Sequence, residues 1–587
     1  MKEEKSLYKT YLGLLIVGII LGILFFRSAV IGPWTLHKHK VRILLVEIIL
    51  VIILPIFLSL SEKVRNWLET SSQRIKRFFV NHKKNCISAL AKFVITTVLC
   101  IVLHFVVNKV LKVETGKAGL ATCLSGFYVG VLLYSFRNTI WKRIEIVFAA
   151  VAFIVGLYFI FVVTPLTGIS WDDQIHYWNT LSLTEKVDGY MSNADDIMVM
   201  SAYDISHSER GLHKDQWVNF VGEMNQKYES RERAQTGPSG WAINRVAYIP
   251  SALGILFGRS IGLNWNHIFD MGKLFNLLMY IGLFTLAIKR VKYGKLFIAI
   301  IGLIPTSLFM ACSYSYDPWL IAWTTLGLAY FVSMLQSPNH YLEMKEYLIM
   351  LLVFMIGCMP KAVYFPMILP ALCIPSSRFK YKKQAFLVRA SVLAVFVLLI
   401  ASFMIPIIRA GGFGGGDIRG GSAVNSTLQV QYILSHPLEA SRTFLKFSRD
   451  YILLDTDNVE TNFTTEMAYL GTGKGWAWVM MLLLTVGILD REEKSLANWK
   501  IRLTGLVGCA CTVLLIVLAL YISFTAVGSE SVAGVQNRYL LPLIFPAFYF
   551  LGTPGNRINR EKSETAILPI GFMAYMFIYT VYRLCIA

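Results

Sequence analysis

The stretch IVFAAVAFIVGLYFIFVV, residues 146–163, is followed at once by TPLTGISWDDQIHYW, residues 164–178. The first part has eighteen residues and no charged side chain, so it has the length and polarity of a helix that spans a membrane. The second part places two carboxylates, Asp172 and Asp173, and the imidazole of His176 just beyond that helix. The sequence therefore predicts a group of ionisable side chains where a span leaves the membrane.

The composition of the whole chain indicates a polytopic membrane protein. Of 587 residues, 55% are hydrophobic and only 16% are charged, with a mean hydropathy of +0.56, whereas soluble proteins have about 25% charged residues. We expect an all-α bundle of about 15 transmembrane helices, the first of them a retained span. The expected spans are residues 9–27, 41–60, 87–110, 119–136, 144–163, 267–289, 294–313, 318–336, 346–359, 361–375, 386–409, 475–489, 502–525, 538–552 and 565–584.

The net charge of +20 comes from 56 Lys and Arg against 36 Asp and Glu. The basic residues collect in short loops between apolar runs, where the positive-inside rule expects them and where they meet anionic lipid. Nucleic-acid binding is therefore excluded as the reason for the charge. The nine cysteines lie almost all within or beside apolar runs, without the spacing of a metal site or a disulfide framework, which indicates a packing role.

The loop charges also predict the sidedness. Residues 61–86 hold seven basic residues against two acidic ones. The loops RNTIWKR (137–143), KRVKYGK (289–295), SSRFKYKK (376–383) and GNRINREK (555–562) are basic as well. Placing these loops in the cytoplasm gives a multi-pass protein of the bacterial plasma membrane, with its N-terminus inside and its C-terminus outside. Basic residues around the loop after the first span are the one exception.

This membrane topology places two long polar segments outside, residues 164–266 and 410–474, and we expect both to carry short interfacial helices. The stretch AYIPSALGILFGRSIGLNW (247–265) reads as a helix along the outer interface, with Trp265 as its anchor. The stretch GGFGGGDIRGG (411–421) lacks a following GK[ST], so it is not a phosphate-binding P-loop. A flexible external loop is expected there.

The paired carboxylates have two explanations. Ser170 and Asp173 have the spacing of a helix-capping box, which accounts for one acid. The capping box does not explain the second acid or His176, which lies one turn further along the same helix face. The functional explanation is a general base at the membrane surface that takes a proton from an acceptor hydroxyl. On the residues alone, both explanations stay open.

A donor for such chemistry has to reach the outer face of the membrane. No nucleoside triphosphate is expected there, so a sugar carried on polyprenyl phosphate fits best. Its departing phosphate needs positive charge, which Lys361 in MPKAVYFP and Arg538 in NRYLLP can supply; snorkelling at a helix end is the alternative for each. Asp317 in SYSYDPW is a further outer acid, and its alternative is a helix N-cap ahead of Pro318.

Seven segments, in order and spacing, carry a resemblance to a known family. They are PLTGISWDDQIHYW, YIPSALGILFGRSIGLNW, GKLFNLL, SYSYDPWLIAW, MPKAVYFPMILP, LQVQYILSHPLEA and NRYLLPLIFP. From about residue 144 to the C-terminus the chain resembles the DUF2142 membrane proteins of bacterial surface-polysaccharide loci, which look like GT-C glycosyltransferases. The resemblance implies a GT-C-like bundle. It divides the chain into a four-helix N-terminal extension, residues 1–140, and a membrane core, residues 141–587.

The first of these segments carries the implied site. It is close to the family pattern P-x-D-E-x-x-H-[FY], which puts the base at Asp172 and the motif histidine at His176. The chain departs from the pattern at two positions: Asp173 stands where the family usually has Glu, and Trp171 where Pro is more usual. The role of Asp173 therefore carries over less directly than that of Asp172.

We therefore expect an inverting glycosyltransferase that moves a sugar from polyprenyl phosphate to a surface glycan or a teichoic-acid-like acceptor, outside the cytoplasm. The expected roles are catalysis for Asp172, Asp173 and His176, donor-phosphate binding for Lys361 and Arg538, and substrate binding for Tyr316, Asp317 and Tyr539. Its partners would be the lipid-linked sugar, the acceptor and membrane lipids. No cofactor is required, although Asp172, Asp173 and Asp317 are of the type that holds a divalent cation.

Two other functions stay open. One is a flippase or export component for lipid-linked glycans, without catalysis, whose mark would be charged residues inside the spans. The other is a scaffold subunit of a polysaccharide assembly complex.

Overall fold

The computed structural model of the chain is built from helices. It describes residues 2–27, 40–81, 83–112, 116–164, 172–189, 191–196, 214–235, 243–337, 341–409, 421–452, 464, 475–489, 497–552 and 562–585. Within these ranges the backbone forms helices and no strand, apart from two isolated bridges, Ser192 with Arg233 and Val424 with Ala526. The expected all-α fold class is confirmed.

The helices follow one another in three groups; the label η marks 3-10 and π-helices. Before the segment 164–266 lie α1 (Lys2–Phe26), α2 (Lys40–Ile48), η3 (Ile49–Ile53), α3 (Leu54–Leu60), α4 (Glu62–Asn81), α5 (Lys83–Lys109), α6 (Gly116–Phe136), η4 (Ile140–Lys142), α7 (Ile144–Tyr158) and η5 (Phe159–Val163). The segment 164–266 contains α9 (Asp173–Asp188), η6 (Asn193–Asp195), α11 (Lys214–Glu229), η7 (Ile243–Tyr248) and α12 (Ile249–Ser260). The rest are α13 (Trp265–Arg290), α14 (Lys295–Gly302), α15 (Pro305–Ala311), α16 (Asp317–Leu335), α17 (Met344–Cys358), η8 (Ala362–Cys373), η9 (Ser376–Arg378), α18 (Lys382–Arg409), α19 (Ser426–Ser435), α20 (Pro437–Ile452), α21 (Gly475–Leu489), α22 (Trp499–Ser523), η11 (Asn537–Leu540), α23 (Leu541–Leu551) and α24 (Lys562–Cys585).

Seven of the described helices are long and apolar enough to cross a membrane. They are Leu7–Phe26 of α1, α5, α6, α7 with η5, α13, α16 and α22, and an eighth is reached if the bent pair on either side of Ser61 counts as one span. Several other apolar helices occupy expected spans but are short or interrupted. The total of about 15 transmembrane helices therefore stays a prediction.

Prolines cause two of these interruptions. Pro305 begins α15 and has no N–H to continue the ladder of α14, so the expected span 294–313 is two short helices. Pro366 and Pro370 lie inside η8, which is a 3-10 helix of twelve residues. The ring of proline removes backbone hydrogen bonds from a regular α-helix, so the second arm of the expected hairpin around Lys361 takes this tighter form.

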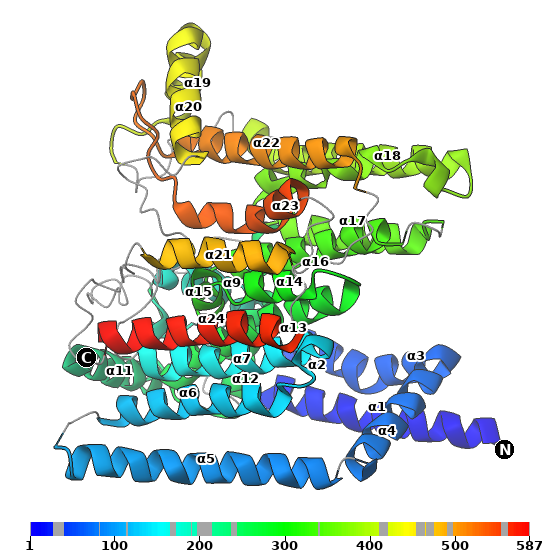
Figure 1. Cartoon of the computed structure of the whole chain (residues 1–587), viewed down its shortest axis with the longest axis vertical. Coiled ribbons are helices and arrows are strands. Elements are labelled where there is room, and N and C mark those ends of the chain that lie inside the picture. Colours follow the sequence, from blue (N-terminus) through cyan, green and yellow to red (C-terminus); the bar gives the residue numbers. More distant parts are fainter. Residues whose placement is uncertain are drawn as a thin grey trace.

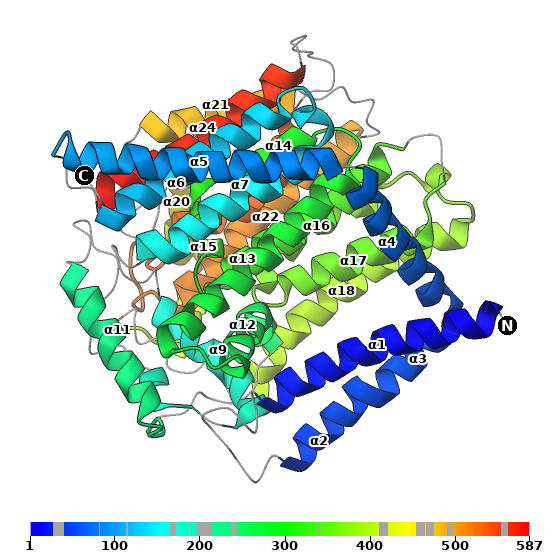
Figure 2. The same cartoon turned by 90° about the horizontal axis from the view of Figure 1, so that it is seen from below.

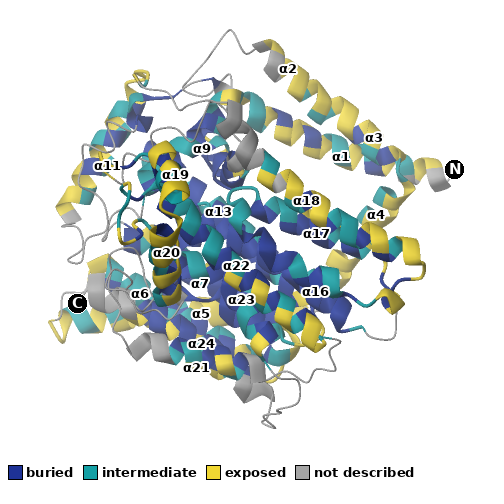
Figure 3. Ribbon diagram, turned by 90° about the horizontal axis from the view of Figure 1, so that it is seen from above, coloured by how far each residue is buried: buried dark blue, intermediate teal, exposed yellow. Residues whose placement is uncertain are grey.

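The helices lie side by side. The N-terminal end of α1 and the C-terminal end of α24 lie on opposite sides of the bundle (Figures 1 and 2). The middle of the bundle is the best packed: 89% of the residues in the apolar window of α16 are buried, against 12% in α5 at the edge. Figure 3 shows the same contrast between the buried centre and the exposed N-terminal helices. The exposed apolar side chains of α5 are suited to lipid contact.

The segment 164–266, together with Ile268, Phe269 and Tyr314, has an apolar core of its own. It is formed by Tyr177, Leu181, Met191, Ala194, Phe220, Met224, Tyr228, Ile255, Trp265, Ile268, Phe269 and Tyr314. Asp195 lies inside this core, where it pairs with Arg259 at 3.3 Å and accepts hydrogen bonds from the hydroxyl of Tyr177 and the indole N–H of Trp265. Trp265 is 1% exposed, so its expected role as an interfacial anchor is wrong. Its indole finds a buried carboxylate instead of lipid headgroups.

Helix α12 has two different faces. One packs closely against α13, where Gly254 and Gly258 meet the backbone and side chains of Ile268 and Met271. The other face exposes Ile249, Leu253, Phe257 and Ile261. The absence of a Cβ at Gly254 allows the two helices to approach at backbone distance.

After α18, α19 and α20 project from the bundle across the direction of α22 (Figure 1). Asn425 caps α19 by accepting a hydrogen bond from the backbone N–H of Leu428 at 3.0 Å, and α20 begins at Pro437. Most of the expected glycine loop, residues 411–420, lies outside the described residues.

The approach of α12 to α13 can be tested by adding one methyl group. A Cβ at Gly254 of α12 would overlap the carbonyl of Met271 of α13, whereas a Cβ at Gly282 of α13 would meet nothing within 4 Å. We expect Gly254→Ala to destabilise the protein by about 1–3 kcal/mol and to lower its melting temperature in detergent. Gly282→Ala is the control and should leave it unchanged. If Gly254→Ala melts at the same temperature as the wild type, the close contact between α12 and α13 is contradicted.

Candidate active site

Five segments that lie far apart in the sequence meet beside the ends of several helices. They are the start of α9, η7, the turn before α16, the turn between α17 and η8, and η11. The side chains connected there by ion pairs, hydrogen bonds, ring contacts and electrostatic interactions are Asp172, His176, Tyr248, Tyr316, Asp317, Lys361, Arg538 and Tyr539. Seven of these eight are residues selected from the sequence.

The carboxylate of Asp317 is the centre of this group. Its Oδ2 lies 3.3 Å from Nε of Arg538, and its Oδ1 lies 3.8 Å from Nζ of Lys361. The hydroxyl of Ser315 donates a further hydrogen bond to Oδ2 at 3.3 Å. The N-cap of α16 is Tyr316 and no side chain caps the helix, so the capping explanation for Asp317 is wrong. One acid therefore links two cations from distant segments.

Lys361 points into the protein. Its Nζ lies 3.7 Å from the ring centre of Tyr539 and 4.9 Å from that of Tyr316, both within cation–π range. Burial by itself lowers the pKa of Lys361, but Tyr316, Tyr539 and Asp317 outweigh it and raise that pKa above its usual value. The ammonium therefore stays charged. Arg538 is buried and Lys361 is half-buried between aromatic rings, so snorkelling toward water does not describe either cation.

His176 is buried in the same group. Its Nδ1 shares a hydrogen bond of 2.9 Å with the hydroxyl of Tyr248, and its ring meets Tyr316 edge-on at 5.2 Å between centres. Burial lowers the pKa of His176 to about 4; Asp317 and Asp172 act to raise it, and Arg538 and Lys361 to lower it. The imidazole is therefore neutral at pH 7.

Asp172 has an unusual backbone. It is the N-cap of α9 with φ 50° and ψ 20°, in the left-handed region, and no side chain caps the helix there. A non-glycine residue in this region costs of order 1 kcal/mol, and such strain collects at functional sites. Asp172 is half-buried, and its charge acts on His176.

Asp173 points away from this group. It is fully buried, accepts a hydrogen bond from the backbone N–H of Tyr314 at 2.6 Å, and lies 3.6 Å from Nζ of Lys273. These contacts join the start of α9 to α13 and to the turn before α16. Ser170, the other member of the expected capping box, lies outside the described residues.

A family model now supports the family that the sequence motifs indicate. The model described as predicted membrane protein (DUF2142) matches residues 153–546. The chain belongs to the DUF2142 family. The matched range contains all eight side chains of the group above, while the first 152 residues lie outside it. No curated protein and no solved structure matches the chain.

Two contacts inside the DUF2142 match were not expected from the sequence. Lys273, in the segment GKLFNLL, is 2% exposed and neutralises Asp173. A lysine inside an apolar run is costly unless it is paired, so its position was a signal that it has a buried acidic partner. Tyr248 gave no such signal, because a tyrosine near a membrane surface is common.

In the part of the chain that the structure describes, no group of three or more His, Cys, Asp or Glu is placed to hold a metal ion. Asp172, Asp173 and Asp317 therefore do not form a set of ligands for a divalent cation. Asp173 is paired with Lys273 and Asp317 with Lys361 and Arg538, so two of the three acids have cationic side chains as partners.

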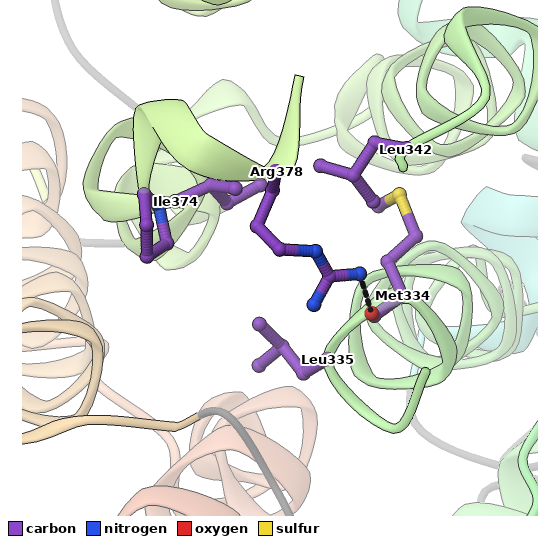
Figure 4. Close-up of a pocket in the computed structure, with 6 residues that line it drawn as sticks. Met334, Leu335, Leu342, Ile374 and Arg378 are labelled. Carbon is purple, nitrogen blue, oxygen red and sulfur yellow. Dashed lines mark hydrogen bonds between the residues drawn. The ribbon is translucent and has the colours of Figure 1, made fainter. Parts of the chain in front are cut away.

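Two hollows lie at a distance from this group. A small pocket at the far end of α16 is lined by Met334, Leu335, Leu342, Ile374, Pro375 and Arg378. There the guanidinium of Arg378 donates to the carbonyls of Met334 and Ser337 at the end of the helix (Figure 4). An open groove of ≈ 730 Å³ runs along α11 and is lined mainly by polar side chains, among them Asn219 and Gln226.

The pair of Asp173 and Lys273 can be tested by removing one charge and then both. We expect Lys273→Met to destabilise the protein by about 3–5 kcal/mol, because it leaves a buried carboxylate without a cation. Asp173→Asn with Lys273→Met should recover most of this loss. The measurement is the melting temperature of each variant in detergent, and no recovery in the double variant would contradict the pairing.

The burial of His176 predicts a pH dependence of stability. Since its folded-state pKa of about 4 lies below the ordinary 6.5, the unfolded chain binds a proton between those values that the folded chain does not. The folded form therefore loses stability as the pH falls from 6.5 to 4, with no further loss from this group below that. His176→Gln should flatten the melting-temperature profile in this window alone. An unchanged profile would contradict the assignment.

Proposed function

We propose that the protein is a GT-C-like glycosyltransferase of the bacterial plasma membrane. It transfers a sugar from a polyprenyl-phosphate donor to a surface glycan or a teichoic-acid-like acceptor, on the extracytoplasmic face. The N-terminus is cytoplasmic in this proposal. The observation that carries it is the joining of Lys361 and Arg538 around Asp317, beside Asp172 and His176.

The charge of this group suits a donor phosphate. Lys361, Arg538 and Asp317 together leave one positive charge, with the second carboxylate, Asp172, set apart as the base, and a polyprenyl-phosphate sugar carries one negative charge on its phosphodiester. When the bond to the sugar breaks, the phosphate gains charge, which fixed cations stabilise. Because Asp317 holds both cations in place, little rearrangement is needed at that moment.

Asp172 is the proposed base. An acceptor hydroxyl attacks the anomeric carbon, the bond from that carbon to the phosphate oxygen breaks with its electron pair, and the proton of the hydroxyl passes to Asp172. A single displacement of this kind inverts the configuration at the anomeric carbon. The half-buried position of Asp172 and its left-handed backbone support this role.

The neighbouring side chains have positioning roles in this proposal. A neutral His176 orients the acceptor hydroxyl through its second ring nitrogen, since its first nitrogen is engaged with Tyr248. Tyr316 and Tyr539 hold the ammonium of Lys361 between their rings and border the donor. Asp173 supports the start of α9 through Lys273 and Tyr314 rather than contacting substrate.

One observation favours the alternative of a flippase. Lys273 is a charged residue buried in α13, a helix long enough to cross the membrane, and such charges mark transport pathways. Its pairing with the fully buried Asp173 fits a fixed structural contact better than a moving charge. The transferase therefore remains the first choice.

The transferase proposal predicts the behaviour of Asp172→Asn. The variant should fold as the wild type does and lose about 10²–10⁴-fold in the transfer of labelled sugar from polyprenyl phosphate, because the general base is gone. Glu185→Gln, which removes an acid three turns further along α9, is the control and should retain activity. Full activity in Asp172→Asn would remove it as the base.

The same preparation separates the two functions. Wild-type protein that transfers no sugar but moves lipid-linked glycan across the bilayer of reconstituted vesicles would establish the flippase and overturn the transferase.

A further inference from the structure

Helix α4 lies between two apolar segments and runs in a different direction from both. It follows α3 after a bend of 95° at Ser61. Arg65 stabilises the bend, because its guanidinium donates to the carbonyls of Ser59 at 2.9 Å and Leu60 at 3.1 Å. Figure 2 shows α4 crossing from the end of α3 to the start of α5, across the direction of α1. A polar helix placed there runs along the membrane surface rather than through it.

Four apolar side chains of α4 form one stripe. Val64, Trp67, Leu68 and Ile75 recur at intervals of three, four and seven residues, so they share a face of the helix. Val64 and Leu68 are half-buried against neighbouring helices. Trp67 and Ile75 are 66% and 59% exposed. A bulky apolar pair left uncovered beside a membrane surface is covered by lipid.

Basic side chains border this stripe. The helix has five basic residues against two acidic ones. Arg74 and Lys76 stand on either side of Ile75, each about 100° around the helix from it, so they reach headgroup level when Ile75 points into the acyl chains. Asn66, Thr70 and Gln73 occupy the opposite face. This is the charge arrangement of a helix that binds an anionic membrane surface.

We propose that α4 is an in-plane helix that binds anionic lipid headgroups in the leaflet next to it. Trp67 and Ile75 insert between the acyl chains, and Arg74 and Lys76 contact the phosphates. Arg77 lies on the polar face, where it donates a hydrogen bond to Gln73 at 3.4 Å, and adds to the positive charge above the headgroups. The helix lies outside residues 153–546, and the proposal does not depend on the transfer reaction.

Lipid binding here would fix the N-terminal helices in place. Helix α4 contacts α1, α3 and α5, and only 17% and 12% of the residues in the apolar windows of α1 and α5 are buried. Protein contacts alone give these helices little support. Lipid headgroups bound to α4 give the N-terminal helices a second attachment, at the point where α1, α3 and α5 meet α4.

The test uses the full-length protein in two kinds of nanodisc. One contains phosphatidylcholine alone, and the other an equal mixture with phosphatidylglycerol. Hydrogen exchange of peptides covering residues 62–81 should be several-fold slower in the anionic nanodiscs. A triple variant, Arg74→Gln with Lys76→Gln and Arg77→Gln, should lose this difference. Trp67→Gln with Ile75→Gln should speed exchange in both lipids.

The control removes the same number of charges elsewhere. Lys380→Gln with Lys382→Gln and Lys383→Gln, around the start of α18, should leave the exchange of residues 62–81 as in the wild type. Exchange at α4 that is equal in the two lipids overturns the proposal. An equal effect of the control variant also overturns it, because the lipid response would then follow net charge and not this helix.

Discussion

A single buried carboxylate, Asp317, holds together the part of the structure on which the candidate site depends. It pairs with Lys361 at the start of η8 and with Arg538 in η11, so it ties α16 to two segments that follow it much later in the chain. Moving ions out of water costs several kcal/mol each, and each partner offsets the cost for the others. Hydrogen bonds from Tyr364 to the carbonyl of Tyr539 and from Tyr451 to that of Gln536 fix η11 further.

The segment 164–266, which lies next to the Asp317 group, is held by a second set of buried charges. Asp195 with Arg259 organises its core, and Asp173 with Lys273 attaches α9 to α13. The two sets have different purposes. Asp173 and Asp195 are buried against other protein groups. Asp172 and the rings of Tyr316 and Tyr539 are only half-buried. Chemistry on a substrate is therefore better placed at the Asp317 group than at the better-buried pairs.

Much of the fold and the choice of site residues could be predicted from the sequence, because charges at the ends of apolar runs are costly and few. That rule selected Asp172, Asp317, Lys361 and Arg538, which the structure brings together. Pairing could not be predicted, since periodicity describes a helix and its faces but not the neighbour it packs against. The sequence therefore predicts the same role for Asp173 as for Asp172. It also predicts that Trp265 contacts lipid, although the apolar core around Tyr177 and Phe220 encloses it.

The proline-rich helix η8 has a consequence for how far the chain reaches. A 3-10 helix rises about 2.0 Å per residue, against about 1.5 Å in an α-helix. Its twelve residues therefore extend about 24 Å instead of about 18 Å, close to the roughly 30 Å thickness of the hydrocarbon layer. The segment that begins beside Lys361 is thus longer than its number of residues suggests, by about 6 Å relative to an α-helix.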